Sequence, residues 1–214
     1  MKVLVTGFEP FGGDGVNPSF EALSRLPAVL GEMAIATRPL PTVFGRALYA
    51  LEDAIAETAP DIVLSVGLAG GRSELSLERI AINVDDARIA DNDGQQPIDR
   101  PIVPGGPAAY FATLPIKAAV LGLRDAGLPA LVSNTAGTFV CNHVFYGLMH
   151  LAATRLPHLR GGFLHLPYLP AQAARQQPGT PSMALDDIVR GIGIILSTAV
   201  ARSEDIAAAE GAIS

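Results

Sequence analysis

The sequence contains a single cysteine and no tryptophan among its 214 residues. One cysteine cannot form a disulfide within the chain, so nothing indicates an oxidising compartment. Basic residues are also scarce, with 15 Lys and Arg against 21 Asp and Glu, and no basic run occurs. A net charge of −6 argues against nucleic acid or an anionic membrane surface as a partner.

Long hydrophobic runs are missing as well. Met1-Lys2 leads directly into a short apolar segment without the pattern of a signal peptide. The most apolar late stretch, Ile188–Val200, contains Arg190 and two glycines and is too short to span a bilayer. We therefore expect a soluble, cytoplasmic protein with no membrane partner.

What the sequence does contain is an alternation of strand-like and helix-like segments without a repeat, which predicts an α/β fold with a largely parallel sheet. The predicted strands are Lys2–Thr6, Glu32–Arg38, Asp61–Val66, Leu77–Val84, Ala130–Asn134 and Gly162–Leu166. Helices are predicted after the N-caps Asn17, Thr42 and Ser182, at Pro115–Ala126, and after the cysteine. We expect one domain over residues 1–214, with a hairpin or long loops at Asp85–Gly106 lying over the site and a frayed tail at about 203–214.

The lone cysteine lies in the segment T-A-G-T-F-V-C-N-H-V-F-Y-G-L-M-H, between a predicted strand and a predicted helix. Cys141 is thus expected in or near the first helical turn. Unpaired N–H groups and the positive end of the helix dipole favour a thiolate there, which suits a nucleophile. A buried cysteine acting as a small hydrophobic residue is the alternative.

A nucleophilic cysteine needs a base, and the chain has four histidines. His143 follows Cys141 by two residues, about 200° around a helix, and His150 also falls on the opposite side. His158 lies among turn residues. His165 ends an apolar strand, and functional groups in α/β sheets gather at the carboxyl ends of strands. Elimination therefore favours His165, with a hydrogen-bonded core histidine as the alternative.

The carboxylate that would orient the imidazole cannot be chosen by spacing. Only Glu78 lies within an otherwise apolar strand pattern, where burial beside a partner and exposure to solvent are equally compatible with the sequence. The candidates are Glu78, Asp85, Asp86, Asp91 and Asp93.

Other chemistries have less support. His143 and His150 are about 10 Å apart along a helix, too far to share one metal ion, and no H-E-x-x-H or paired C-x-x-C motif occurs. We expect no metal and no cofactor. The glycine-rich segments Gly7–Gly13, Gly67–Arg72 and Gly105-Gly106 match no nucleotide-binding motif but could bind an anion through backbone N–H groups. A phosphorolytic or ligand-binding protein without covalent catalysis is therefore the rival hypothesis.

Several blocks in one order make the chain resemble the pyroglutamyl peptidase I (pyrrolidone-carboxylate peptidase) family of cysteine peptidases, from Met1 to about Arg202. The blocks are V-T-G-F-E-P-F-G-G with N-P-S, P-T-V-F, V-G-L-A-G-G-R, E-R-I-A-I-N-V-D-D-A-R-I-A-D-N-D-G, G-G-P-A-A-Y, L-P-I-K, T-A-G-T-F-V-C-N-H-V-F-Y-G-L and G-G-F-L-H-L-P-Y-L-P.

This resemblance implies an α/β/α sandwich similar to nucleoside phosphorylases and a catalytic triad of Glu78, His165 and Cys141. It selects Glu78, which spacing alone does not. It also implies a cytosolic, metal-independent enzyme that removes N-terminal pyroglutamate from peptides through a thioester and commonly forms tetramers. We accordingly expect a homo-oligomer, a tetramer or a dimer.

The resemblance further implies the binding residues. Arg88 would assist the Cys141 backbone N–H in holding the oxyanion. The pyroglutamyl ring would lie in a slot formed by Phe8, Phe11, Asn17, Ile89 and Val140. Leu68 is a departure, because many bacterial relatives carry glutamine there, and it puts in doubt a side-chain hydrogen bond to the lactam. Asn134 likewise replaces a tyrosine or another residue often found before T-A-G-T.

Overall fold

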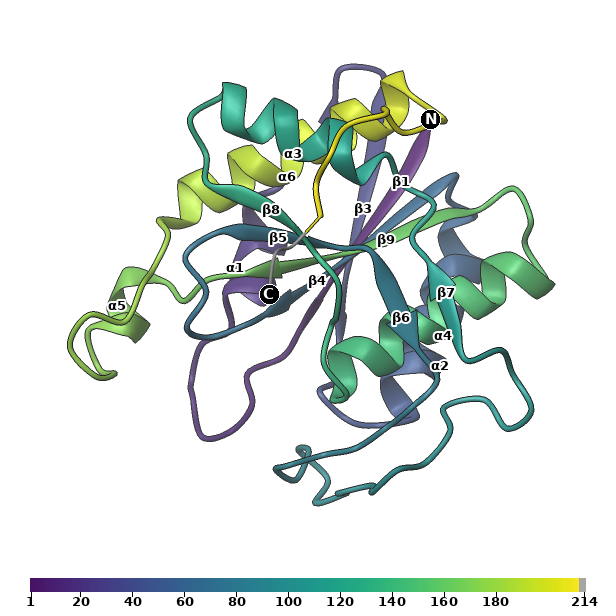
Figure 1. Cartoon of the computed structure of the whole chain (residues 1–214), viewed down its shortest axis with the longest axis vertical. Helices are drawn as coiled ribbons and strands as arrows, with labels where there is room; N and C mark the ends of the chain where they lie inside the picture. Colours follow the sequence, from purple (N-terminus) through teal and green to yellow (C-terminus); the bar gives the residue numbers. More distant parts are fainter. Residues whose placement is uncertain (212–214) are drawn as a thin grey trace.

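The computed structural model describes residues 1–211, which form a central sheet with helices on both faces (Figure 1). The strands are β1 (Lys2–Phe8), β2 (Val29–Leu30), β3 (Met33–Leu40), β4 (Ile62–Leu68), β5 (Leu75–Glu78), β6 (Ile80–Ile82), β7 (Ala109–Phe111), β8 (Ala130–Ser133) and β9 (Arg160–Leu166). The helices are α1 (Pro18–Arg25), α2 (Arg46–Thr58), α3 (Ile116–Asp125), α4 (Val140–Thr154), α5 (Pro170–Ala173) and α6 (Leu185–Ala201).

The main sheet has seven strands in the order β2-β3-β1-β4-β9-β5-β8. Its centre, from β3 to β9, is parallel, as predicted from the uniformly apolar strands. β2 pairs antiparallel with β3, and β5 pairs antiparallel with β9 but parallel with β8. The sheet is thus mostly parallel, and the β5–β8 pair runs in the opposite direction to the central strands.

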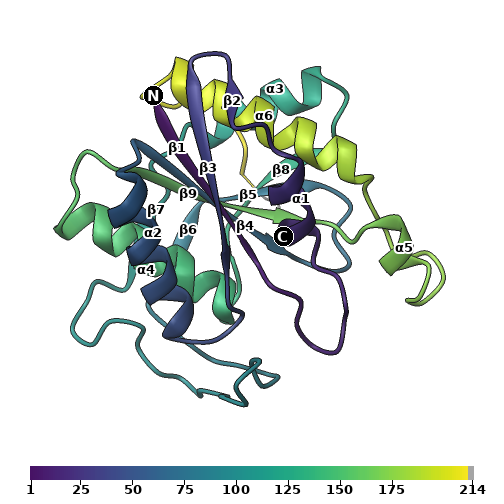
Figure 2. The same cartoon turned by 180° about the vertical axis from the view of Figure 1, so that it is seen from behind.

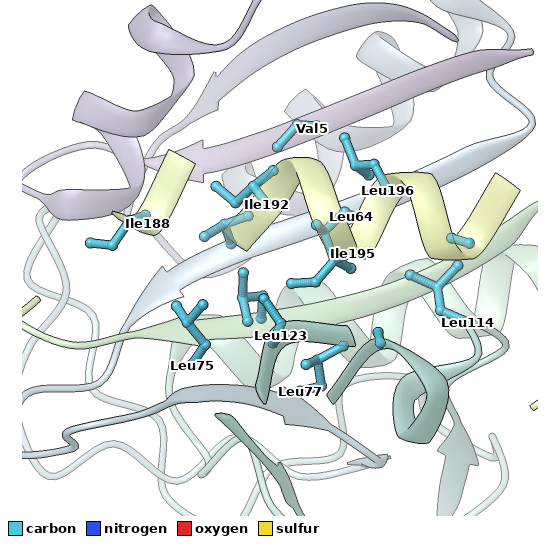
Figure 3. Close-up of a cluster of buried hydrophobic side chains, with 14 of the residues drawn as sticks. Val5, Leu64, Leu75, Leu77, Leu114, Leu123, Ile188, Ile192, Ile195 and Leu196 are labelled. Atoms are coloured by element: carbon cyan, nitrogen blue, oxygen red, sulfur yellow. The ribbon is translucent and has the colours of Figure 1, made fainter. Parts of the chain in front are cut away.

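Alternating side chains along the strands form two cores. On one face, residues such as Val5, Leu64 and Leu77 pack against α1, α3 and α6, and Figure 3 shows Ile188, Ile192 and Ile195 of α6 among them. On the other face, a second cluster joins the sheet to α2 and α4, which lie together in Figure 2. The α/β/α arrangement expected from the sequence is therefore confirmed.

One predicted strand is divided in two. Leu77–Val84 was expected to be continuous, but the chain leaves the main sheet at Arg79, after β5. β6 then pairs antiparallel with β7 in a separate two-stranded sheet. The irregular segment that follows is a long loop rather than a hairpin, closed by an isolated bridge between Asp85 and Arg100. Asp86 N–H donates to Thr138 O at 3.0 Å, which holds this loop against the start of α4.

Of the three predicted N-caps, only Asn17 is confirmed: its side chain accepts from Ser19 N–H at the start of α1. Thr42 instead donates to Glu9 O at 2.9 Å, and α2 begins after Gly45. Ser182 forms a bridge with Tyr168, and α6 begins after Ala184. Both hydroxyl-bearing residues lie in segments held by tertiary contacts, which outweigh the local capping preference.

The expectation of a frayed tail is wrong for residues 203–211. The Asp205 carboxylate accepts from the backbone N–H groups of Lys117 and Ala118 at 2.9 and 3.0 Å, at the first turn of α3. Glu210 binds both terminal nitrogens of Arg124, and its backbone carbonyl accepts from Arg79. This part of the tail therefore docks beside α3 by specific polar contacts. Residues 212–214 lie outside the described residues.

Candidate active site

The period of two along the strands directs His165 and Glu78 to the same face of the sheet. In β9, Leu164 and Leu166 pack into the α3 and α6 core, so His165 between them points to the α4 side. In β5, Leu75 and Leu77 enter the same core, so Glu78 also points to the α4 side. Antiparallel pairing of β5 with β9 brings the two polar side chains together.

The two side chains form a buried carboxylate–imidazole pair. Glu78 is completely buried, and its Oε1 lies 2.7 Å from His165 Nδ1. A hydrogen bond donated by Nδ1–H to this carboxylate keeps the proton of the neutral ring on Nδ1 and leaves a lone pair on His165 Nε2. This is the tautomer that a general base requires.

Cys141 is the second residue of α4, so its predicted position in the first helical turn is confirmed. The turn before it contains Gly137 at φ 76°, a backbone conformation that favours glycine. The thiol lies against β4: a Cβ atom added to Gly67 would be 2.8 Å from Cys141 Sγ. Gly67 pairs in register with His165. The thiol and the imidazole therefore lie at the same point of the sheet.

The expected lowering of the cysteine pKa is wrong. The pKa of Cys141 is raised from 9.0 to about 12, mainly by burial and also by the negative charge of Glu78, while the positive charge of Arg72 partly opposes both effects. Desolvation of the thiolate is the largest of these effects. The thiol consequently rests protonated at neutral pH and needs a neighbouring base to become a nucleophile.

Arg72 was not among the residues predicted for the site, although it ends the V-G-L-A-G-G-R block. Its guanidinium Nη1 donates to Glu78 Oε1 at 2.9 Å, the same oxygen that faces His165. The one sequence signal for this contact is the arginine itself, directly after a glycine-rich loop at the carboxyl end of β4.

The aromatic residues expected in the pocket are linked to this pair through other rings. Phe8 is buried and lies 6.3 Å from the Phe163 ring, which is 4.9 Å from the His165 ring. Phe11 lies 6.1 Å from Phe139, the residue that precedes α4. Phe8 is thus connected to the His165 ring through Phe163, and Phe11 to the start of α4 through Phe139.

The other predicted binding residues divide into buried and exposed groups. Val140 is buried at the start of α4, and Leu68 ends β4 opposite Leu166. Asn17 is buried, and its side chain hydrogen bonds with the Glu9 carbonyl and with Ser19, so these contacts serve the α1 N-terminus. Arg88 and Ile89 are exposed on the long loop, two or three residues beyond its tie to Thr138.

The remaining histidines are engaged elsewhere. His143 Nδ1 lies 2.8 Å from Asp85 Oδ2, and its Nε2 accepts from Gly45 N–H at 3.0 Å. Both ring nitrogens of His143 are therefore used in holding α4 against α2 and the long loop. His150 Nδ1 pairs with the Tyr110 hydroxyl at 2.9 Å, and His158 is exposed.

The competing acidic residues also have other partners. Asp91 accepts from the backbone N–H groups of Phe44, Asp93 and Gln95, and Asp93 forms an ion pair with Arg46. Within residues 1–211, no group of three or more His, Cys, Asp or Glu side chains is arranged to hold a metal ion. No helix in this part of the chain is both long enough and apolar enough to cross a membrane.

A buried carboxylate–imidazole pair beside a lone cysteine is the arrangement of a cysteine peptidase. The model of the pyroglutamyl peptidase family matches residues 1–202. The chain belongs to the pyroglutamyl peptidase family. It is 60% identical over 210 residues to pyrrolidone-carboxylate peptidase 1 of Ralstonia nicotianae, covering 98% of this chain and 97% of that protein.

Other family members agree over the same length. The pyrrolidone-carboxylate peptidase of Escherichia fergusonii is 55% identical, with 98% of both chains covered. The crystal structure of pyroglutamyl peptidase I from Bacillus amyloliquefaciens superposes with a TM-score of 0.94 at 49% identity, covering 97% of this chain and 99% of that chain. A mutant pyrrolidone carboxyl peptidase from Pyrococcus furiosus gives 0.91 at 44%, covering 94% and 99%.

Proposed function

We propose that this protein is a pyroglutamyl peptidase I, a cysteine exopeptidase that hydrolyses the bond after an N-terminal pyroglutamyl residue. Membership of the family supports the reaction and the class of substrate. The observation that carries the mechanism is the 2.7 Å contact between His165 and the buried Glu78, at the point of the sheet where the Cys141 thiol lies.

In the proposed mechanism, His165 Nε2 accepts the thiol proton as Cys141 Sγ attacks the carbonyl carbon that follows the pyroglutamyl ring. The imidazolium so formed is stabilised by Glu78. The tetrahedral intermediate collapses as His165 returns the proton to the leaving amine, and the C–N bond breaks. Water, deprotonated by His165, then hydrolyses the thioester and releases pyroglutamate and the free thiol.

Because the thiol rests protonated, proton transfer to His165 belongs to the attack itself. The developing oxyanion can accept from the Cys141 backbone N–H, since the first N–H groups of a helix have no partner within the helix. We assign Arg88 as a second donor, which requires its exposed side chain to turn toward the bound substrate.

The pyroglutamyl ring is small, flat and uncharged, and suits a slot between aromatic faces. We place it between the Phe8 side and the Phe11 side of the site, near Leu68, Ile89 and Val140. Asn17 would act on this slot by fixing the Glu9 carbonyl and the start of α1.

We also propose that the protein works in the cytoplasm as a homo-oligomer. A single catalytic thiol is best preserved in a reducing compartment. Large apolar side chains on the surface, including Tyr49, Ile98 and Phe111, offer contacts between copies. Light scattering after size-exclusion chromatography distinguishes a tetramer, a dimer and a monomer.

The reaction is tested by hydrolysis of a pyroglutamyl amide, with prolyl and glutamyl amides as controls. Cys141→Ala and Cys141→Ser should keep the fold and lose nearly all turnover, and activity should survive EDTA. An active Cys141→Ala enzyme would rule out the cysteine-peptidase mechanism, whereas no hydrolysis by the unaltered enzyme would favour the rival ligand-binding or phosphorolytic hypothesis.

The base is tested by comparing two histidine variants. His165→Ala should abolish turnover, because the other three histidines are engaged elsewhere or exposed and are not placed to accept the thiol proton. His143→Ala should unfold more easily, since it leaves Asp85 and Gly45 N–H without their buried partner. Its folded fraction should nevertheless retain kcat/KM within about threefold of the unaltered enzyme. An essential His143 with a dispensable His165 would overturn the assignment.

A further inference from the structure

Glu78 is a completely buried carboxylate whose Oε1 faces two donors, and its Oε2 has no hydrogen-bond partner within residues 1–211. A buried carboxylate held only by a neutral imidazole is costly to keep ionised. Arg72 supplies the permanent positive charge that such a carboxylate needs, because a guanidinium stays protonated at any relevant pH.

Arg72 also connects the segments that carry the site. It belongs to the loop between β4 and β5, its Nη1 donates to Glu78 at 2.9 Å, and its Nη2 donates to Thr135 O at 3.4 Å. Thr135 lies in the turn that leads from β8 into α4, where Cys141 is located. One side chain therefore spans the loop after β4, the orienting carboxylate and the turn before the nucleophile.

We propose that Arg72 is a positioning residue that keeps Glu78 ionised and directed at His165, which makes the relay Arg72–Glu78–His165–Cys141. This inference rests on the triad of the proposed function. Arg72 would act through Glu78 and would touch neither the substrate nor the reacting atoms.

The charged and titratable groups that face Glu78 come from three elements: Arg72 from the loop, His165 from β9 and the Cys141 thiol from α4. Removing the one fixed positive charge disfavours the deprotonated form of every other group in this set. The pKa of the Cys141 thiol, which the positive charge of Arg72 lowers, should then rise. Because both limbs of the pH profile of kcat/KM report groups of this set, both limbs should move to higher pH.

The experiment compares Arg72→Met and Arg72→Lys with the unaltered enzyme and with Arg79→Met. Arg79 carries the same charge one residue after Glu78, but its side chain reaches the tail carbonyl of Glu210. Arg72→Met should lower kcat about tenfold or more with little change in KM, and should move both limbs upward by roughly one pH unit. Arg72→Lys should restore part of the lost kcat and should move the limbs less far. Arg79→Met should change neither kcat nor the limbs.

An independent readout comes from alkylation, because Cys141 is the only thiol in the chain. Its rate of reaction with iodoacetamide at pH 8 should fall about tenfold in Arg72→Met, as expected if loss of a neighbouring charge shifts the pKa by roughly one unit. This measurement needs no substrate, so it tests Arg72 even if the unaltered protein fails to hydrolyse the pyroglutamyl amide.

The proposal is overturned if Arg72→Met has the same pH profile of kcat/KM and the same alkylation rate as the unaltered enzyme, even if its turnover falls. A raised KM with kcat preserved would do so as well, because it would place Arg72 on the substrate. If Arg72→Met does not fold, the proposal is tested on the folded Arg72→Lys enzyme by the same two measurements, the pH profile of kcat/KM and the alkylation rate.

Discussion

Gly67 of β4 leaves the space that the Cys141 thiol occupies. A Cβ atom at this position would lie 2.8 Å from Cys141 Sγ and 3.0 Å from the Phe163 ring. Gly67 does not have a positive φ, so the requirement is for space rather than for backbone freedom. Because Gly67 has no side chain, the Cys141 thiol of α4 can approach His165 on the neighbouring strand β9.

Gly67→Ala should therefore impair catalysis far more than folding. The added methyl group must displace the thiol or the Phe163 ring, and a displacement of about 1 Å can cost roughly 100-fold in rate. Overpacking should cost about 1–3 kcal/mol of stability. Gly15→Ala is the matched control, because a Cβ there meets nothing within 4 Å. Steady-state kinetics and urea unfolding of both variants check this, and a fully active Gly67→Ala enzyme would contradict it.

Stability at alkaline pH should depend on Cys141. Its pKa is about 12 in the folded chain against 9.0 for an ordinary cysteine, so the unfolded chain releases this proton first as the pH rises. The thiol then contributes stability that is fully present below pH 9 and is lost progressively toward pH 12.

Between pH 9 and 11 the unaltered protein should therefore lose about 1–2 kcal/mol more than Cys141→Ser, allowing for partial solvent screening of the thiol. Urea unfolding of both proteins in the presence of a reductant measures the difference, in which all other titrating groups cancel. Equal losses in the two proteins would show that the thiol is not desolvated in the folded chain.

The docked tail should contribute stability without contributing to catalysis. Pro115 precedes α3 and provides no side-chain cap, and the Asp205 carboxylate accepts from the first free N–H groups instead. Asp205→Ala should thus cost roughly 1 kcal/mol, as for loss of an N-cap. Glu204→Ala, at the preceding exposed position, should cost little. Thermal unfolding compares the two, and kcat/KM should be unchanged in both; a stable Asp205→Ala protein would mean that the cap is dispensable.

The features that could be predicted from the sequence are those fixed by local pattern. Uniform apolar runs located the parallel strands, and the strand–turn–helix context located Cys141. Elimination among four histidines led to His165 because helical geometry is regular enough to exclude His143. Each of these inferences depends on residues close together in the chain.

Contacts that depend on sheet order could not be predicted from spacing. Glu78 meets His165 only because β5 runs antiparallel beside β9, a pairing between residues 87 positions apart. The sequence left five acidic candidates, and only the family resemblance selected one. The cysteine pKa was misjudged for a related reason, since the burial that determines it comes from packing of α4 on the sheet. Arg72 was missed because its partner lies on a strand of unknown position.

Leu68 is one of two positions, with Asn134, at which the chain is expected to depart from the family pattern. It ends β4, is partly exposed and pairs with Leu166, and the next residue, Ala69, donates its N–H to Leu166 O at 2.9 Å. The lactam of pyroglutamate presents one N–H and one C=O, and burying either without a partner costs roughly 1–3 kcal/mol. A glutamine side chain could supply such a partner, and leucine cannot.

We expect backbone groups of the loop after β4 to replace that partner, because a glycine-rich loop brings N–H and C=O groups close to a small ligand whatever the side chain. Leu68→Gln should then change KM by less than about tenfold and leave kcat almost unaltered, the pattern of a change in uniform binding. Leu68→Met controls for side-chain size without adding polarity. The ratio of kcat/KM for pyroglutamyl and prolyl amides should stay the same in all three enzymes. A gain of about two orders of magnitude in kcat/KM for Leu68→Gln would instead mean that Leu68 adapts this site to a ring less polar than pyroglutamate, because only an unmet hydrogen bond to the lactam could yield so much on restoration.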